Sequence, residues 1–454
     1  MAVVSGGSER TVRAEEGGRE TGFLRYSDGF RIDLLRADDE ETAERLVRSV
    51  MASAAYEGAG EVSVHAVDPD GTVGKACRRL GFSASGGCPC CQREGAACLS
   101  MKFRDRYVLS LLGIDRPVFQ KEDDGRFSAW RDGARPVEEL RRFVESALDP
   151  LDPGFIPPED RIAVFDMDGT ILSENNPGDI EWAMYLRRVL FDPGYVPDDE
   201  QRDLAEEMIK VIRTGVKGPG FTQRKNRCNA RAFKGMSVDE YRKYVSDFIS
   251  EPSCTYEGAS RRNLFYEPMM QLVRYLEESG FEVFVCSATE ALSVRTTLAG
   301  TGIPPYRVIA TEYSLTASGR GDIDAVNYVM RPYDRLIYTG EIVTVASGMN
   351  KVTKLAYGLG KRPVIAFGNG SGDYSMLTYV SSNPAHKGKC FMLIADDSER
   401  DYGSVERTAS VRAHAEEEGW IIISMKEDFE RIYDGCVRPR YKDIGELFDS
   451  GRKI

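Results

Sequence analysis

The sequence lacks a long apolar segment and an excess of positive charge. Its N-terminus has no apolar stretch of the kind found in secretory signals, and no run approaches the length that crosses a membrane. The formal net charge is -12, so the chain as a whole has no electrostatic attraction for nucleic acid or for anionic membranes. We therefore expect a cytoplasmic protein that binds neither nucleic acid nor a membrane.

The 10 cysteines lack the spacing of a disulfide framework. Cys286 falls inside an apolar segment and others are dispersed, which indicates reduced thiols. Cys88, Cys90, Cys91 and Cys98 are clustered, but they include one Cys-x-x-Cys pair and no second pair to complete a zinc site. We expect a structural or adventitious role for this cluster, and the sequence leaves metal binding there open.

The chain of 454 residues is long enough for two or three domains. Composition and periodicity predict a disordered N-terminus at residues 1–22, a small α+β module at 23–105 and a linker at 106–127. A larger domain follows at 128–437, with a C-terminal tail at 438–454. Its strands alternate with helices, which indicates an α/β fold with a doubly wound, mostly parallel sheet.

The small N-terminal module ends in a sequence that resembles part of a GNAT-type acetyltransferase. Residues 73–82, which close with Leu80, Gly81 and Phe82, are similar to the end of that fold. Such enzymes hold the coenzyme A pyrophosphate on a Gly-rich loop at a helix N-terminus. Residues 38–41 occupy that place here, and they are four acids without a glycine. We expect a degenerate module with a structural or regulatory role that does not bind acetyl-coenzyme A.

An apolar segment at residues 162–165 is followed by Asp166, Asp168, Gly169 and Thr170. The segment is typical of a buried parallel strand, and open α/β sheets place their chemistry at the carboxyl ends of such strands. Alternation along an extended chain sends the two carboxylates to the same side, and Gly169 permits the turn that keeps them together. Two carboxylates at one point can hold a divalent cation.

Other polar groups lie where later strands end or a helix begins. Ser287 and Ala288 follow a second apolar strand, Lys351 opens a helix, and a Gly-rich loop from Asn369 to Asp373 follows a further strand. The carboxyl ends of parallel strands meet at one edge of a sheet, so these groups are expected to converge with the aspartate pair.

A helical insert over about 176–280 separates the first two of these strands. It is longer than a crossover connection needs, so we interpret it as a cap over the site. Its middle part is basic in an otherwise acidic protein and can attract a phosphate if it faces the site. The basic residues are Arg224, Lys225, Arg227, Arg231 and Lys234.

Together, these features of residues 128–437 strongly resemble the haloacid dehalogenase superfamily of phosphohydrolases. The resemblance implies that Asp166 is the nucleophile and Asp168 the general acid/base. It also implies that Ser287 binds a phosphoryl oxygen and that Lys351 neutralises charge.

The cofactor implied is Mg²⁺, held by Asp166, Asp168 and the loop that contains Asn369 and Asp373. This loop has Asn369 where the family often has an aspartate, so the site has one negative charge fewer. We expect Asp373 to be the direct ligand and rank Asn369 second. An all-oxygen site of carboxylates, the Asp168 carbonyl and waters suits magnesium.

Phosphoryl transfer explains the residue types independently of the resemblance. The chemistry needs an anionic nucleophile brought in line with a dianion, and a metal and a cation to cancel their repulsion. Asp166 would form an aspartyl-phosphate while Asp168 protonates the leaving alkoxide. We therefore predict a magnesium-dependent phosphatase that acts on a small phosphorylated metabolite. The alternatives are a phosphomutase or phosphotransferase of the same fold, or a catalytically weak regulatory protein; the oligomeric state stays open.

Within the superfamily the arrangement looks closest to the phosphoserine-phosphatase-like branch, which includes phosphorylcholine-phosphatase-like enzymes. We expect Thr170, Glu174 and Ala288 to contact the substrate. The Glu174 carboxylate can receive an amino or quaternary ammonium group, and Trp182 or Tyr185 can supply an aromatic face for it.

Overall fold

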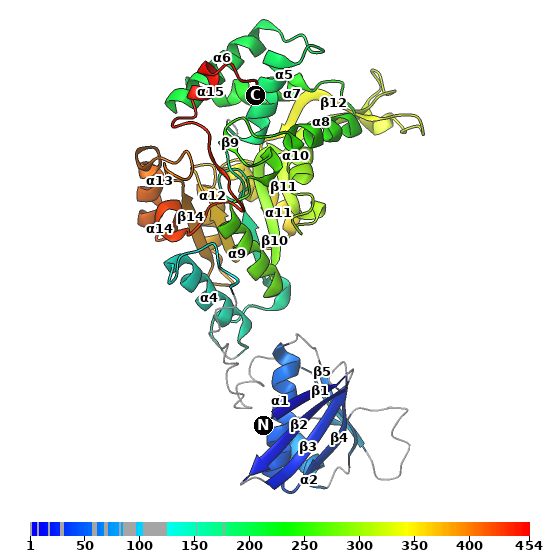
Figure 1. Cartoon of the computed structure of the whole chain (residues 1–454). Coiled ribbons are helices and arrows are strands. Elements are labelled where there is room, and N and C mark those ends of the chain that lie inside the picture. Colours follow the sequence, from blue (N-terminus) through cyan, green and yellow to red (C-terminus); the bar gives the residue numbers. More distant parts are fainter. Residues whose placement is uncertain are drawn as a thin grey trace. The chain divides into compact units, whose positions relative to one another are not determined.

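The computed structural model describes most of the chain. The described residues are 2–6, 9–16, 19–27, 31–56, 61–67, 71–80, 83–84, 97–102, 125–150, 152–175 and 178–454. The chain divides into an N-terminal unit of Met1–Lys121 with Val144–Pro158 and a C-terminal unit of Glu122–Phe143 with Glu159–Ile454. Both are drawn in Figure 1. Within the described residues, no helix combines the length and the apolar character that a membrane span requires.

The N-terminal unit contains a seven-stranded sheet in the order β1-β2-β3-β4-β5-β7-β6. Neighbouring strands are antiparallel except β4 and β5, which are parallel. The elements are β1 (Ala2–Gly6), β2 (Glu9–Glu16), β3 (Arg19–Ser27), β4 (Arg31–Ala37), α1 (Glu40–Tyr56), β5 (Glu61–Val67), α2 (Thr72–Arg79), β6 (Ser83–Ala84) and β7 (Ala97–Lys102).

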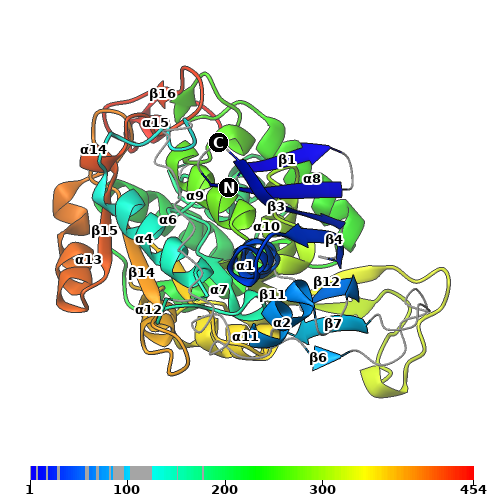
Figure 2. The same ribbon diagram turned by 90° about the horizontal axis from the view of Figure 1, so that it is seen from below.

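Helix α1 covers this sheet, and Figure 2 shows it nearly end-on beside the strands. The helix begins where the Asp39 carboxylate accepts a hydrogen bond from the backbone N–H of Thr42 at 2.7 Å, which caps a first-turn donor. Leu24 of β3 and Ile32 of β4 are fully buried. The helix residues that share this apolar core are Ala43, Leu46, Val47, Val50 and Met51.

The described residues among 1–22 differ from the predicted disorder, because they form β1, β2 and the first part of β3. Glycine and glutamate are depleted in strands, so composition alone did not indicate a sheet here. Cys88, Cys90 and Cys91 lie outside the described residues, so the interpretation of their cluster remains a prediction. Most of the predicted linker at 106–127 also lies outside them.

The C-terminal unit is organised around a second seven-stranded sheet in the order β12-β11-β10-β8-β13-β14-β15. All neighbours are parallel except β11 and β12, so the doubly wound parallel sheet is confirmed. The strands are β8 (Ile162–Phe165), β10 (Glu282–Glu290), β11 (Val308–Ala317), β12 (Leu336–Thr344), β13 (Ile365–Gly368), β14 (Lys389–Ile394) and β15 (Ile421–Ser424). The first predicted strand, β8, lies at the centre.

Helices cover both faces of this sheet, and its core is apolar. Phe367 stacks on Phe165 with ring centroids 4.1 Å apart and on Phe391 at 4.6 Å. The α-helices of this part of the chain, apart from α5–α8 and α15, which are given below, are α4 (Arg135–Leu148), α9 (Glu267–Glu278), α10 (Ala291–Thr297), α11 (Met349–Leu359), α12 (Tyr374–Ser381), α13 (Val405–Glu417) and α14 (Met425–Asp428). Stacked rings from three adjacent strands fix the strand ends that carry the polar residues.

Four of the helices in the insert between β8 and β10 lie beyond one end of the sheet, at the top of Figure 1, whereas α9 precedes β10. The four are α5 (Ile180–Phe191), α6 (Asp199–Thr214), α7 (Phe221–Ala232) and α8 (Val238–Ser250). Helices α6 and α8 begin with capping boxes at Asp198 and Ser237. The basic stretch forms α7, a helix that the sequence did not predict because charged residues interrupt its apolar periodicity.

Residues 438–454, predicted as a tail, pack against the cap. Strand β16 (Arg438–Pro439) pairs with β9 (Tyr256–Glu257), and α15 (Glu446–Asp449) follows. Arg213 of α6 donates to Asp449 at 2.7 Å, and Arg187 of α5 donates to the carbonyl of the buried Ile454 at 2.9 Å. These contacts join residues distant in sequence, which local patterns do not indicate.

Candidate active site

A buried ion-pair triad lies at the carboxyl ends of β8 and β13. Lys351 Nζ, in the first turn of α11, donates to Asp166 Oδ1 at 2.5 Å and to Asp373 Oδ1 at 2.7 Å. All three side chains are buried. Removing one partner of such a buried group leaves an uncompensated charge, so the three form one electrostatic unit. The structure thus brings together three of the residues that the sequence predicted for one site.

Asp168 faces a different set of partners. Its Oδ2 accepts hydrogen bonds from Thr289 Oγ1 at 2.8 Å and from Ser287 Oγ at 3.3 Å. The Thr289 N–H donates to Ser287 Oγ at 3.1 Å, and Ser287 is fully buried. The other carboxyl oxygen, Asp168 Oδ1, is buried and has no hydrogen-bond partner among the described residues. One oxygen therefore orients the group while the second stays available.

Sequence reasoning did not assign a role to Thr289. Ser287 and Thr289 are two residues apart near the end of β10. Residues at that spacing point to the same side of a strand. The same alternation of side chains along an extended chain, which predicted that Asp166 and Asp168 lie together, also predicts that Thr289 lies on the same side as Ser287.

The Asn369 amide connects the two aspartates. One end of this amide lies 3.3 Å from Thr170 Oγ1, 3.2 Å from Asp166 Oδ2 and 3.3 Å from the Asp168 carbonyl oxygen. With its nitrogen at that end, the amide donates to these oxygens. With its oxygen there, it completes a set of three oxygens from Asn369, Asp166 and Asp168.

That set fits a magnesium ion. Ligands at 2.0–2.1 Å in octahedral geometry lie about 3 Å from their neighbours, which is close to the observed oxygen spacing. Among the described residues, no group of three or more His, Cys, Asp or Glu side chains is arranged to hold a metal. A cation here would therefore need the Asp168 carbonyl and the Asn369 amide in addition to carboxylate oxygens.

Asp373 is held by protein donors at both oxygens. Its Oδ2 accepts from the N–H groups of Asn369 at 3.0 Å and Gly370 at 3.1 Å, while its Oδ1 accepts from Lys351. The predicted ranking placed Asp373 before Asn369 as a metal ligand. The geometry instead puts Asn369 beside the Asp166 and Asp168 oxygens.

Two glycines permit this close approach. Gly169 has φ +78°, and a Cβ there would lie 1.9 Å from the Asn369 side chain. A Cβ on Gly368 would lie 2.5 Å from the Cβ of Asp373. Any side chain at either position would displace a residue of the site. The turn predicted at Gly169 is present.

The two aspartates of the motif differ in their affinity for protons. Burial raises the pKa of Asp166 to about 6, with Asp373 adding to the rise and Lys351 opposing it. Burial, together with Asp179 and Asp166, raises the pKa of Asp168 well above its usual value. Burial alone would lower the pKa of Lys351, but its two carboxylate partners more than reverse that effect. Asp168 is therefore suited to hold a proton while Asp166 ionises.

Two further carboxyl groups, Glu174 and Asp179, lie near the aspartates on the cap side of the site and hold their protons more tightly than usual. Burial, Asp179 and Asp166 raise the pKa of Glu174 to about 8, and only Lys217 among the leading contributors opposes the rise. Burial also raises the pKa of Asp179 to about 6, against the opposing effect of Lys225. The Glu174 side chain nevertheless retains a solvent-exposed surface.

Hydrogen bonds hold the segment on both sides of Glu174. Ser173 Oγ lies 3.0 Å from Tyr256 Oη, and Tyr256 also bonds to the buried Asp401. On the other side, Asn175 donates to Asp401 at 3.3 Å, and its carbonyl accepts from Thr255 at 2.6 Å. Asp401 thereby fixes the backbone that carries Glu174.

The condition set for the basic stretch of the cap, that it face the site, is not met by its arginines, which pair with acids inside the cap. Arg231 pairs with Glu200 at 2.7 Å and also with Asp198, while Arg224 and Arg227 pair with acids of α6. The acids of α6 therefore neutralise these arginines within the cap.

Lys225 is the buried member of the stretch. Its Nζ donates to the buried Glu181 at 3.1 Å, and Tyr313 Oη donates to the same carboxylate. Burial alone would lower the pKa of Lys225, but Glu181 and Asp179 more than offset this. Because Asp168 also raises this pKa, Lys225 brings a positive charge near the general-acid candidate.

The remaining predicted contacts lie in different environments. Ala288 is exposed between Ser287 and Thr289 in the chain, and its carbonyl accepts a hydrogen bond from Thr311 at 2.6 Å. Thr170 is fully buried and donates to Asp166 Oδ2 at 3.1 Å, so it orients the carboxylate. Trp182 is half-buried and packs on Phe221 at 5.3 Å.

Tyr185 does not supply an aromatic face to the site, contrary to the interpretation from sequence. The side chain is fully buried, and its hydroxyl donates to the backbone carbonyl of Gln201 at 2.9 Å. It belongs to the interior of the cap, where α5 and α6 pack together.

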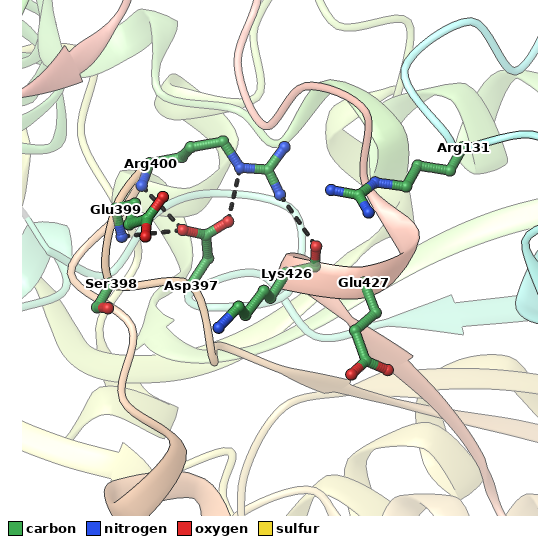
Figure 3. A pocket seen from close by; sticks show the side chains of 7 residues that line it. All are labelled: Arg131, Asp397, Ser398, Glu399, Arg400, Lys426 and Glu427. Carbon is green, nitrogen blue, oxygen red and sulfur yellow. Dashed lines mark hydrogen bonds and ion pairs between the residues drawn. The ribbon is translucent and has the colours of Figure 1, made fainter.

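A separate pocket of about 230 Å³ lies beyond the ends of β14 and β15, and none of the predicted site residues lines it. Figure 3 shows Arg400 bonded to the Asp397 carboxylate, at 2.6 Å, and to the backbone carbonyl of Lys426. The lining residues are Arg131, Asp397, Ser398, Glu399, Arg400, Lys426 and Glu427. Their charges balance, which gives the pocket no preference for an anion or a cation.

The sequence of the parallel-sheet region matches a known family. The family model for haloacid dehalogenase-like hydrolases matches residues 163–378, which include Asp166, Asp168, Ser287, Lys351 and Asp373. This segment is a haloacid dehalogenase-like hydrolase domain. The resemblance inferred from the motifs is therefore confirmed. No curated protein matches the chain.

Solved structures with similarity to this chain are distant. A protein with unknown function from Bordetella pertussis Tohama I is 16% identical, with 58% of this chain and 97% of that chain covered and a TM-score of 0.38. Cytosolic 5′-nucleotidase IIIB bound to cytidine is 13% identical, with coverage of 73% and 94% and a TM-score of 0.38. A substrate-bound phosphoserine phosphatase is 14% identical, with coverage of 52% and 86% and a TM-score of 0.28.

Proposed function

We propose that this hydrolase is a magnesium-dependent phosphatase that cleaves phosphomonoesters of small metabolites through an aspartyl-phosphate on Asp166. The observation that carries the proposal is the difference between the two aspartates. Asp166 is paired with the Lys351 ammonium at 2.5 Å, whereas Asp168 has a strongly raised pKa and one unpartnered oxygen. One group is suited to act as a nucleophile and the other as an acid.

In the proposed first step, an oxygen of Asp166 attacks phosphorus as the bond from phosphorus to the ester oxygen breaks. Asp168 gives its proton to the departing alkoxide, so the alcohol leaves neutral and Asp168 becomes a carboxylate. In the second step, Asp168 takes a proton from water, and the resulting hydroxide attacks phosphorus. Inorganic phosphate is released and Asp166 is regenerated. Lys351 offsets the negative charge around Asp166 in both steps.

The proposed magnesium ligands are Asp166, the Asp168 carbonyl and Asn369, with Asp373 holding Lys351 and the loop. This order reverses the ranking of Asp373 and Asn369 made from sequence, because both Asp373 oxygens accept hydrogen bonds from the protein. When bound, the ion would offset the charge of the phosphoryl oxygens. Ser287 remains the proposed partner of a phosphoryl oxygen, and Ala288 lies beside it.

The proposed substrates carry a positive amino or quaternary ammonium group. Support comes from the charges near Glu174, where Asp179, Asp166 and Asp373 are the acids and Lys217 is the nearby cation. A cationic substrate group would offset this negative charge and favour the ionised form of Glu174. A neutral sugar phosphate would not.

The proposal is tested with the full chain and a panel of phosphomonoesters, with and without magnesium. Phosphate release should require magnesium and should fall to background in an Asp166→Asn variant whose circular dichroism spectrum shows that it is folded. Asp203→Asn, on the exposed side of α6, is the matched control and should keep full activity. Substantial turnover by the Asp166 variant would contradict the assignment.

A further inference from the structure

The hairpin between β11 and β12 ends in an arm, residues 318–335, that extends beyond the helices around the sheet in Figures 1 and 2. The arm presents apolar side chains to solvent. Val326 is 92% exposed, Val329 83% and Tyr333 73%, and Ile323 and Met330 are about half exposed. These five side chains lie within 11 consecutive residues, and exposed apolar groups gathered in one place mark interaction surfaces in soluble proteins.

The interior of the arm is polar. Asp334 is buried, and its carboxylate accepts hydrogen bonds from Tyr328 Oη at 2.6 Å, the Arg331 N–H at 2.8 Å and the Gly319 N–H at 3.0 Å. A Cβ on Gly319 would lie 2.3 Å from an Asp334 oxygen, so the close approach requires glycine. The arm therefore places a carboxylate inside and its apolar side chains outside.

Further hydrogen bonds close the arm at its base and its tip. The Ser318 N–H donates to the Arg335 carbonyl at 2.8 Å, and the Arg335 N–H donates to Ser318 Oγ at 3.0 Å. At the tip, Asp324 accepts from the Val326 N–H at 2.9 Å and caps the short helix Ala325–Asn327. The apolar surface is thus held in one conformation before any partner binds, which lowers the entropic cost of binding.

The arm has no net charge, although the chain carries -12. Its three basic residues are Arg320, Arg331 and Arg335, and its three acidic residues are Asp322, Asp324 and Asp334. Two copies of an acidic protein repel each other, so they approach best through a neutral surface. In a two-fold arrangement Arg320 of one arm can face Asp322 of the other, because such an interface is self-complementary.

We propose that the arm is a self-association surface and that two copies of this chain pair through it. Burying a side chain of this size removes roughly 100 Å² from water. Five such side chains on each of two arms give about 1,000 Å², which lies at the lower limit for specific interfaces. The pairing is therefore reversible and depends on protein concentration. This inference goes beyond the proposed catalytic function and does not depend on it.

The first experiment measures the mass of the full chain by analytical ultracentrifugation from about 1 to 200 μM. Wild-type protein should shift from monomer to dimer across this range. The Val326→Asp/Val329→Asp variant should stay monomeric. The matched control is Val196→Asp/Val216→Asp, which places the same charges at exposed valines of the cap and should still dimerise. Monomeric wild type at the highest concentration, or dimerisation of the arm variant, would overturn the proposal.

A second experiment distinguishes a second copy from a different partner. Arg320→Glu makes the arm acidic and Asp322→Arg makes it basic, so each variant alone should dimerise less than wild type. Their equimolar mixture should recover association, because opposite charges then face each other. Unchanged melting temperatures show that both variants fold. A mixture that associates no better than the separate variants would also overturn the proposal.

Discussion

Thr289 donates a hydrogen bond to Asp168 at 2.8 Å, the shorter of two hydroxyl contacts to that carboxyl group. The contact joins the turn after β8 to the end of β10, and it leaves Asp168 Oδ1 without a partner. Thr289 holds Asp168 Oδ2, and this contact orients the carboxyl group. It thereby leaves Oδ1 as the oxygen that would exchange a proton with the substrate.

Replacing Thr289 with valine should lower kcat/KM by about 10- to 150-fold, the equivalent of a charge-assisted hydrogen bond worth roughly 1.5–3 kcal/mol. Thr289→Ser keeps the hydroxyl and is the matched control, expected within a few-fold of wild type. Steady-state kinetics on two substrates, one with a poor and one with a good leaving group, would test whether the loss comes from a misplaced acid. A loss of equal size on both would point to general disruption rather than to a misplaced acid.

Asp168→Asn should abolish turnover of alkyl phosphates but still permit attack by Asp166 on an activated aryl phosphate. The leaving group then departs without a proton, whereas hydrolysis of the aspartyl-phosphate lacks its base. Intact-protein mass spectrometry after rapid quenching should detect one added phosphoryl group per chain. The Asp166→Asn variant should acquire none. Absence of the adduct in the Asp168 variant would remove the support for a covalent intermediate.

Sequence patterns located the centre of the fold because its strands are short, apolar and end in chemically distinctive residues. Asp166, Lys351 and Asp373 were predicted as one group, and the ion pairs between them are present. The parallel sheet follows from the same segments, since their polar residues meet only if the strands run in one direction.

The parts that sequence did not predict depend on contacts between distant residues. Arg231 looks available to a phosphate until Glu200 and Asp198 of another helix are placed beside it. Tyr185 looks like a ligand-binding aromatic until its burial in the cap is known. Residues 438–454 resemble a tail because their partners lie some 180 to 270 positions earlier in the chain. Thr289 is different, because strand alternation alone would have found it.

Asn369→Ala should raise the magnesium concentration needed for half-maximal activity by roughly 10- to 100-fold, the range seen when metal sites lose a supporting group. Asn369→Asp should lower it, because a carboxylate restores one negative charge to the site. Magnesium titrations of activity, with binding followed by calorimetry, would measure both. If the Asn369→Ala variant needs the same magnesium concentration as wild type, Asn369 is not a ligand and Asp373 becomes the preferred candidate.

Glu174 should make the magnesium-free protein less stable as the pH rises from about 4.5 to about 8. Its pKa in the folded protein is raised to about 8, so over this range the folded state holds a proton that the unfolded state has released. More protons bound in the folded state means that the free energy of unfolding falls with rising pH. Glu174→Gln should therefore raise Tm more at pH 8.5 than at pH 5. An equal gain at both would show that Glu174 is already ionised at the lower pH.

Glu174→Gln should also change substrate choice. Wild-type protein is expected to have a higher kcat/KM for phosphoserine, phosphoethanolamine or phosphocholine than for glucose 6-phosphate, because only the first three bring a positive charge to Glu174. Removing one charge-assisted contact should shrink that ratio by roughly 10- to 150-fold, or about 1.5–3 kcal/mol. Glu278→Gln, at an exposed position at the end of α9, is the matched control and should leave the ratio unchanged. An unchanged ratio in the Glu174 variant would mean that Glu174 does not select the substrate. Asp179 and Lys225, two charged side chains of the cap that interact electrostatically with Asp168, would then be the next candidates.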